Sequence, residues 1–184
     1  MRRIVVWPDP DLEMRSREVE AKDGVIDDEI LQIAMEMDAF VSQGGGLGLS
    51  AVQIGSLSRV IAFDREAAQF DKQYKKVKGA KPLPFGFLVN PVVVEVKQPM
   101  EPVREGCLSV PKVEIEVLRP QGLLVEGLVL VGDNLVGRRI QAGGLLASVL
   151  AHEIDHLNGR LIVHFLDKVN RAKVRRRLLG LSQD

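Results

Sequence analysis

Apolar and polar positions alternate with a helical period between residues 26 and 43. The apolar positions three or four apart are Ile26, Ile30, Ile33, Ala34, Met37, Phe40 and Val41. Asp27, Asp28 and Glu29 stand at the start, where carboxylates suit the positive end of a helix dipole. Three glycines at 44–46 are typical of a helix end. We therefore predict an amphipathic helix over this segment.

Short runs rich in Val, Ile and Leu predict strands further along the chain. Gly, Pro or Asp-Asn separate these runs, as is typical of turns. The runs cover residues 59–63, 87–96, 113–117, 123–131 and 136–141. Residues 64–86 contain several lysines and two prolines, so we predict an exposed loop there.

Two more helices are predicted near the C-terminus, over residues 145–157 and 167–179. Gly159 lies just past the end of the first. A helix followed by strands and then by helices favours an α+β fold with an antiparallel or mixed sheet, rather than a βαβ repeat. A length of 184 residues fits one domain spanning residues 1–184.

The charge balance and the cysteine count narrow the class of protein. Lys and Arg number 25, equal to Asp and Glu, so no global field favours DNA or a membrane surface. A single cysteine, Cys107, excludes an intrachain disulfide. Pro8 and Asp9 interrupt the apolar start too early for a signal peptide, and no apolar run is long enough to span a membrane. We expect a cytoplasmic protein.

The segment His152-Glu153-Ile154-Asp155-His156 is the strongest chemical signal in the sequence. Histidines at i and i+4 lie on one helix face, so both imidazoles can reach one metal ion. Glu153 follows the first histidine, from where its carboxylate can reach water on the metal and act as a general base. The alternative is two ordinary surface histidines, yet the chain has only three histidines in all. We predict a metal-binding helix.

The residues alone leave the third metal ligand open. The metzincin pattern requires a histidine at position 162, which is isoleucine, and His164 lies in an apolar, strand-like run that favours a structural role. Asp167 and upstream acids remain candidates for a protease-type site. Cys107 is a soft ligand for a first-row metal, a nucleophile paired with histidine, or a small buried residue.

A glycine-rich segment follows the first predicted helix, from Gly46 to Gly55. It lacks the Gly-Lys-Ser/Thr ending of a phosphate loop and follows a helix rather than a strand, so neither nucleotide motif fits. The simplest interpretation is a helix end and a turn. A sharper one is that glycine lets the backbone approach a ligand closely, while Gln53 donates its amide N–H to a developing oxyanion.

Taken together, three motifs resemble those of the peptide deformylases, in the same order. Gly46–Gln53 resembles GxGxAAxQ, Glu105–Ser109 matches EGCLS, and His152–His156 matches HExDH. The opening segment from Ile4 to Asp9 is also similar to the start of that family. The resemblance implies hydrolysis of the N-formyl group from the formylmethionine of nascent polypeptides, with release of formate.

The resemblance also assigns roles. One divalent metal would be bound by Cys107, His152 and His156. The family's usual metal is ferrous iron, and Zn²⁺, Ni²⁺ or Co²⁺ can replace it. Glu153 would be the general acid and base, and the Gln53 amide with the backbone N–H of Leu108 would hold the oxyanion. The substrate-binding positions would be Gly46, Leu47, Gly48, Val103, Arg104, Glu105, Leu145 and Val149. Backbone near Gly48 would pair with an extended peptide.

Two positions depart from the family pattern, and a third, Arg119, keeps it. Ser50 replaces the alanine of the family pattern, and we expect little effect from so small a change. Glu114 stands at the spacing of a family arginine near the peptide groove, which predicts an altered peptide preference. Arg119 is expected to pair with Glu105 and to steady the cysteine strand.

The last predicted helix is strongly basic. Its cations are Lys168, Arg171, Lys173, Arg175, Arg176 and Arg177. It is either a solvated helix or a contact with ribosomal RNA, whose phosphates attract cations without sequence reading. Competing hypotheses for the whole chain are a zincin-type metallopeptidase and a deformylase-like protein with altered acyl or peptide specificity or without turnover.

Overall fold

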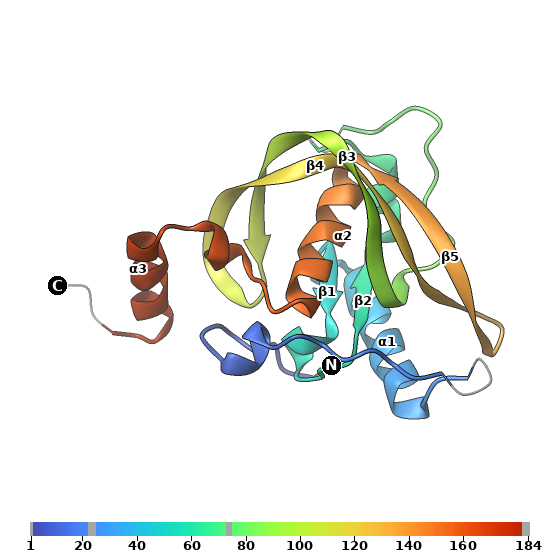
Figure 1. The fold of residues 1–184 in the computed structure, drawn as a ribbon, viewed down its shortest axis with the longest axis horizontal. Helices are drawn as coiled ribbons and strands as arrows, with labels where there is room; N and C mark the ends of the chain where they lie inside the picture. Colours follow the sequence, from blue (N-terminus) through green and yellow to red (C-terminus); the bar gives the residue numbers. More distant parts are fainter. Residues whose placement is uncertain (1, 22–24, 73–74, 182–184) are drawn as a thin grey trace.

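Five antiparallel strands form the sheet of the computed structural model, which describes residues 2–21, 25–72 and 75–181 (Figure 1). The strands follow one another across the sheet in the order β1-β2-β3-β4-β5, and each pairs antiparallel with its neighbour. Their bounds are Gly48–Ser50, Val60–Phe63, Phe87–Cys107, Val110–Val131 and Asn134–Gly143. The predicted α+β class is thus confirmed, with an antiparallel sheet.

Three α-helices accompany the sheet in the described part of the chain, at the predicted places. They are α1 (Asp28–Phe40), α2 (Gly144–Leu157) and α3 (Lys168–Leu178). The carboxylate of Asp27 caps α1 by accepting the backbone N–H of Glu29. After Phe40 the chain widens into a π-turn that ends where Gly44 takes a φ of 83°, a backbone conformation that suits glycine.

The strands β3 and β4 make one long hairpin, which corrects the strand prediction. The runs predicted separately at 113–117 and 123–131 belong to the single strand β4, and β3 continues past residue 96 to Cys107. A register shift between Lys97 and Met100 falls at Pro99, where a bulge lets the strand bend without ending, and Pro102 pairs in register with Leu118. The hairpin closes at Leu108–Ser109, so its tip presents Cys107.

Two other local interpretations differ from the structure. The apolar run at 161–166 is not a strand, because residues 162–165 form a 3-10 helix. The glycine-rich segment is more than a helix end and a turn, because Gly48–Ser50 forms the edge strand β1. Glycine has no side chain that could contribute to an alternating pattern, so the sequence did not indicate this strand.

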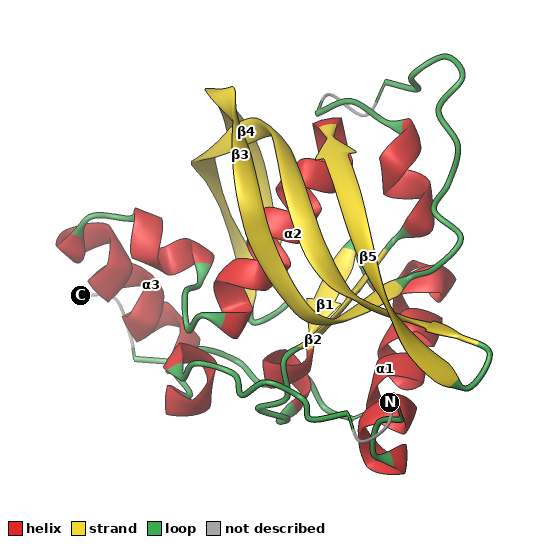
Figure 2. Cartoon of the chain, turned by 45° about the vertical axis from the view of Figure 1, so that its right-hand side comes forward, coloured by secondary structure: helices red, strands yellow, loops and turns green. Residues whose placement is uncertain are grey.

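Helix α2 lies at the centre of the molecule, with β3 and β4 curving around it (Figures 1 and 2). Its residues Leu146, Leu150 and Leu157 are buried against the sheet. Helix α1 packs with β1 and β2 in a second apolar cluster, and α3 lies at the outer end of the molecule. None of the helices in the described ranges has the length and apolar character needed to cross a bilayer.

Candidate metal centre and substrate pocket

Cys107, His152 and His156 converge on one point. The Nε2 atoms of the two histidines are 3.2 Å apart, and the Cys107 Sγ lies 3.2 Å from the Nε2 of His156. Ligands of one tetrahedral ion with bonds of about 2.0–2.3 Å keep a similar spacing. Among the described residues, these three form the group whose donor atoms could hold a metal ion. The sequence alone left the role of Cys107 open. In the structure this cysteine lies beside the histidine pair, at the tip of the β3–β4 hairpin.

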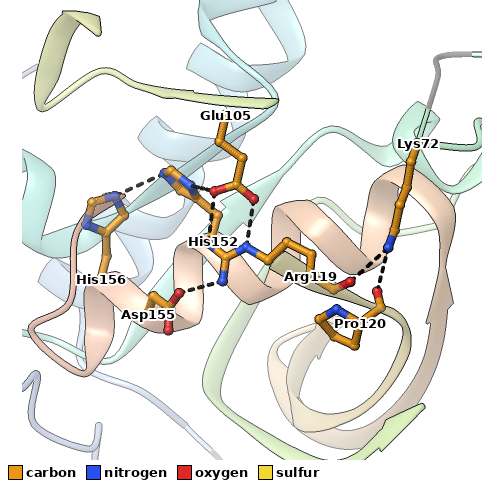
Figure 3. A network of polar contacts seen from close by, with 7 residues as sticks. All are labelled: Lys72, Glu105, Arg119, Pro120, His152, Asp155 and His156. Carbon is orange, nitrogen blue, oxygen red and sulfur yellow. Dashed lines mark hydrogen bonds and ion pairs between the residues drawn. The ribbon is translucent and has the colours of Figure 1, made fainter. Parts of the chain in front are cut away.

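A buried ionic network supports the histidine side of this group (Figure 3). Arg119 on β4 donates from Nε and Nη2 to both carboxylate oxygens of Glu105, at 2.7 and 2.9 Å. Its Nη1 donates to Asp155 on α2 at 2.6 Å. The predicted pair of Glu105 and Arg119 is confirmed, and Asp155 joins it. Glu105 and Arg119 are both almost fully buried, so the charge of each depends on its partner for compensation.

The same network fixes the orientation of the His152 ring. The Nδ1 of His152 lies 3.0 Å from the carboxylate of Glu105, which accepts a hydrogen bond from it and turns Nε2 toward the other two donors. Burial opposes a charged His152, yet hydrogen bonds with Cys107 and Glu105 raise its pKa well above the ordinary value. For Glu105, burial alone would raise the pKa. The hydrogen bonds from Arg119 and His152 outweigh burial, so the pKa of Glu105 lies below its ordinary value.

Glu153 is buried beside the donor group and is only 4% exposed. Burial raises its pKa to about 7, against an ordinary value of 4.5. Its Oε2 has no hydrogen-bond partner among the described residues. A buried carboxyl with a free oxygen and a pKa near neutrality has the properties of a general acid and base.

Gln53 faces the cysteine from the other side, in the short 3-10 helix that follows β1. Its Oε1 accepts the backbone N–H of Ser50 at 2.9 Å, so its Nε2 points toward the donor group. There Nε2 donates to the Ser109 hydroxyl at 3.2 Å and lies 3.6 Å from the Cys107 Sγ. The backbone of the N-terminal segment braces this arrangement, because Val5 donates to the Gln53 carbonyl and Trp7 to the Ser109 carbonyl.

A cavity of about 530 Å³ opens over these groups. Its walls contain every predicted site residue except His156, which is fully buried beneath it. Those predicted residues are Gly46, Leu47, Gly48, Gln53, Val103, Arg104, Glu105, Cys107, Leu108, Leu145, Val149, His152 and Glu153. Sequence reasoning missed Ser148, Pro111, Lys112 and Val113, which also line the cavity and carry no motif of their own.

The rim of the cavity carries opposite charges. Glu114, which also lines the cavity, pairs with Arg104 at 2.7 Å, and both side chains are mostly exposed. The negative charge at position 114 is thus partly balanced by a neighbour on the adjacent strand. The altered peptide preference expected from Glu114 stays a prediction.

His164 and Asp167 lie outside the donor group. The Nδ1 of His164 accepts the backbone N–H of Leu161 at 3.0 Å, and its Nε2 lies 3.3 Å from Glu13. The Trp7 indole donates to the same Glu13 carboxylate, so His164 ties two distant segments together. Asp167 caps α3 by accepting the backbone N–H of Asn170.

An antiparallel sheet around a helix that supplies two histidine ligands, with a facing cysteine and a buried glutamate beside them, is the arrangement of a metal-dependent hydrolase. The family model for polypeptide deformylase matches residues 1–172. A peptide deformylase of Rhizobium meliloti is 36% identical over 174 residues, which cover 95% of this chain and 90% of the relative. A peptide deformylase of Rickettsia prowazekii is 33% identical, with 98% and 96% covered. The chain therefore belongs to the polypeptide deformylase family.

Solved structures agree with this assignment. The crystal structure of peptide deformylase from Ehrlichia chaffeensis is similar with a TM-score of 0.81 and 32% identity, covering 98% of this chain and 96% of that one. A structure of the Ehrlichia protein in complex with actinonin has a TM-score of 0.80 and 31% identity, covering 100% and 99%. The similarity therefore extends over the whole fold.

Proposed function

We propose that this hydrolase removes the N-formyl group from the formylmethionine of nascent polypeptides, with Glu153 as its acid and base and with Gln53 and Leu108 as its oxyanion donors. The family assignment supports the deformylation itself. The observation that carries the residue roles is the convergence of Cys107, His152 and His156 beneath a cavity that also contains Glu153 and Gln53.

Cys107, His152 and His156 would hold one divalent ion, for which their donor set of one sulfur and two nitrogens is suited. We propose ferrous iron, with zinc, nickel or cobalt as substitutes that the same ligands accept. Such an ion supplies Lewis acidity and makes water a nucleophile near neutral pH. The Glu105 carboxylate orients His152 for this task.

Glu153 would transfer protons, while Gln53 and Leu108 would stabilise the negative charge. Glu153 takes a proton from the water that attacks the formyl carbon, and it returns that proton to the departing methionine amine. The Gln53 amide and the Leu108 backbone N–H donate to the oxygen that becomes negative. Formate and a free methionine N-terminus are the products.

The walls of the cavity suit the proposed substrate. Leu47, Val103, Leu145 and Val149 offer an apolar pocket for the methionine side chain, with Arg104 and Glu105 close to its mouth. Strand β1 is at the edge of the sheet, so the backbone near Gly48 can pair with an extended peptide. Backbone pairing gives affinity without demanding a particular sequence beyond the methionine.

Removing one ligand tests the proposed metal site. Cys107→Ser is expected to bind less than one-tenth of an equivalent of Zn²⁺ after gel filtration and to lose deformylase activity, while His164→Ala keeps one equivalent. Full metal occupancy in Cys107→Ser would contradict the proposal and would favour a site built from the helix and a downstream acid, as in a zincin.

We further propose that α3 docks the enzyme on the ribosome in the cytoplasm, where nascent chains emerge. Lys168, Lys173, Arg175 and Arg176 are exposed on this helix. Phosphate binding by such a helix depends steeply on salt. Co-sedimentation with ribosomes should weaken between 50 and 200 mM salt and should fall further in a Lys173→Gln/Arg176→Gln variant. Salt-independent or absent co-sedimentation would argue against this role.

A further inference from the structure

Ser50 lies where strand β1 meets the short 3-10 helix that carries Gln53, although the sequence alone predicted little effect of a serine at this position. It is the last residue of β1 and is fully buried. Its hydroxyl oxygen is 3.0 Å from the Oε1 of Gln53, and its backbone N–H donates to the same Oε1 at 2.9 Å. One residue therefore supplies both donors that hold the oxygen end of the Gln53 amide.

This double contact decides which way the Gln53 amide points. A carbonyl oxygen has two lone pairs, and here the backbone N–H and the hydroxyl of Ser50 can occupy both. Turning the amide over would place its NH₂ group against the Ser50 N–H, two donors facing each other. With Oε1 held, Nε2 is directed toward Ser109 and Cys107, where the oxyanion is proposed to form. An alanine at position 50 keeps the backbone N–H bond to the Gln53 Oε1 and loses the hydroxyl contact.

We propose that Ser50 is a positioning residue that holds the Gln53 amide in the orientation needed to stabilise the oxyanion. The inference rests on the proposed oxyanion role of Gln53. It concerns the transition state rather than substrate binding, so it predicts an effect on kcat and not on KM.

Kinetics of Ser50→Ala give the first test. One buried hydrogen bond between neutral groups corresponds to a fall in kcat of about three- to ten-fold, with KM for a formyl-Met-Ala-Ser peptide within about two-fold of the wild type. Ser16→Ala is the matched control, because Ser16 is also buried and its hydroxyl has no partner among the described residues. Its kinetics should equal those of the wild type.

A double variant separates positioning from a structural role in the short 3-10 helix. If Ser50 acts through Gln53, adding Ser50→Ala to Gln53→Ala should change kcat by less than about two-fold. Losses that multiply in the double variant would overturn the proposal. An unchanged kcat in Ser50→Ala would do the same.

A spectroscopic readout is independent of turnover. In zinc-loaded, ¹⁵N-labelled protein, the Gln53 side-chain NH₂ signals, assigned by their loss in Gln53→Ala, should shift and exchange faster in Ser50→Ala but not in Ser16→Ala. Unchanged signals would overturn the link between Ser50 and Gln53. If Gln53→Ala itself keeps full kcat, the proposed oxyanion role fails, and these signals still report separately on the contact.

Discussion

At the scale of single residues, the site depends on the space left beside Glu153. A Cβ added to Gly48 would lie 2.8 Å from the Cγ and 2.9 Å from the Cδ of Glu153, closer than carbon atoms can approach. Gly48 is therefore needed for the room that it leaves, since its own φ does not lie in the left-handed region. Any larger residue at this position would have to displace the Glu153 side chain or move β1 away from helix α2.

Gly48→Ala tests that constraint. The added methyl group must displace the Glu153 carboxylate, and a displacement of about 1 Å in a catalytic group can lower the rate on the order of 10²-fold. We expect such a loss in kcat/KM with metal content unchanged. Gly137→Ala is the control, because a Cβ there meets no atom within 4 Å. Equal activity of both variants would show that Gly48 does not constrain Glu153.

Arg119→Met tests the buried ionic network. It leaves Glu105 and Asp155 without their shared cation, and breaking a buried pair from one side costs about 3–5 kcal/mol of unfolding free energy. Loosening of His152 should also weaken metal binding about 10- to 100-fold. The exposed pair of Arg139 and Glu126 gives a control, since Arg139→Met should cost under about 1 kcal/mol. Similar losses in urea denaturation for both variants would contradict this account.

The Glu105 carboxylate predicts how stability depends on pH. Its pKa in the folded protein lies below the ordinary value of 4.5, since the bonds from Arg119 and His152 outweigh burial. Its contribution to stability is therefore complete above pH 4.5 and is lost as the pH falls through the folded pKa. The unfolding free energy of the wild type should fall more steeply below pH 4.5 than that of Glu105→Gln. Parallel curves for the two proteins would contradict the assignment.

At the scale of elements, the first residues of β4 connect the site to α3. Arg177 on α3 donates to the carbonyl oxygens of Pro111 and Lys112, at 3.3 and 2.8 Å, and both residues line the cavity. Val174 and Leu178 on the same helix pack against the apolar cluster that contains Val110 and Cys107. Helix α3 therefore supports one wall of the cavity and also presents its other cations to solvent.

Two arginines on α3 separate these roles. Arg177→Ala removes the contact with the start of β4, and for an exposed group the loss is at most about 1 kcal/mol, or a rise in KM of up to about five-fold. Arg175→Ala removes the same charge without changing the contact with β4, so its KM should stay unchanged. Both variants should weaken ribosome co-sedimentation to a similar degree. A raised KM in Arg175→Ala would show that net charge, rather than the contact, matters.

The elements also show what the sequence could predict. Helices α1 and α2 followed from their apolar periodicity, and the pair of Glu105 and Arg119 followed from the family resemblance. Strand β1 was missed because glycine gives no pattern, and the far half of β3 was missed because prolines inside a bulged strand resemble turns. Asp155 and Ser109 took on contacts that only the packing of distant segments creates.

At the scale of the whole molecule, the fold brings together donors that lie far apart in sequence. Cys107 comes from a hairpin tip, the histidines from the central helix, and Gln53 from the segment after the edge strand. The residues alone predicted the histidine pair, because both ligands lie on one helix, but left the third ligand open. Its identity depends on how a long hairpin folds over a helix, and no local pattern encodes that.

Formate release is the most direct test of the central claim. Protein purified anaerobically with ferrous iron should release formate from a formyl-Met-Ala-Ser peptide. Glu153→Gln should bind the same amount of metal and lose on the order of 10²–10⁴-fold in rate, because a positioned proton carrier is gone. Glu95→Gln, a change at an exposed glutamate of β3, should match the wild type. Absence of formate from the metal-loaded wild type, or full activity in Glu153→Gln, would contradict the account.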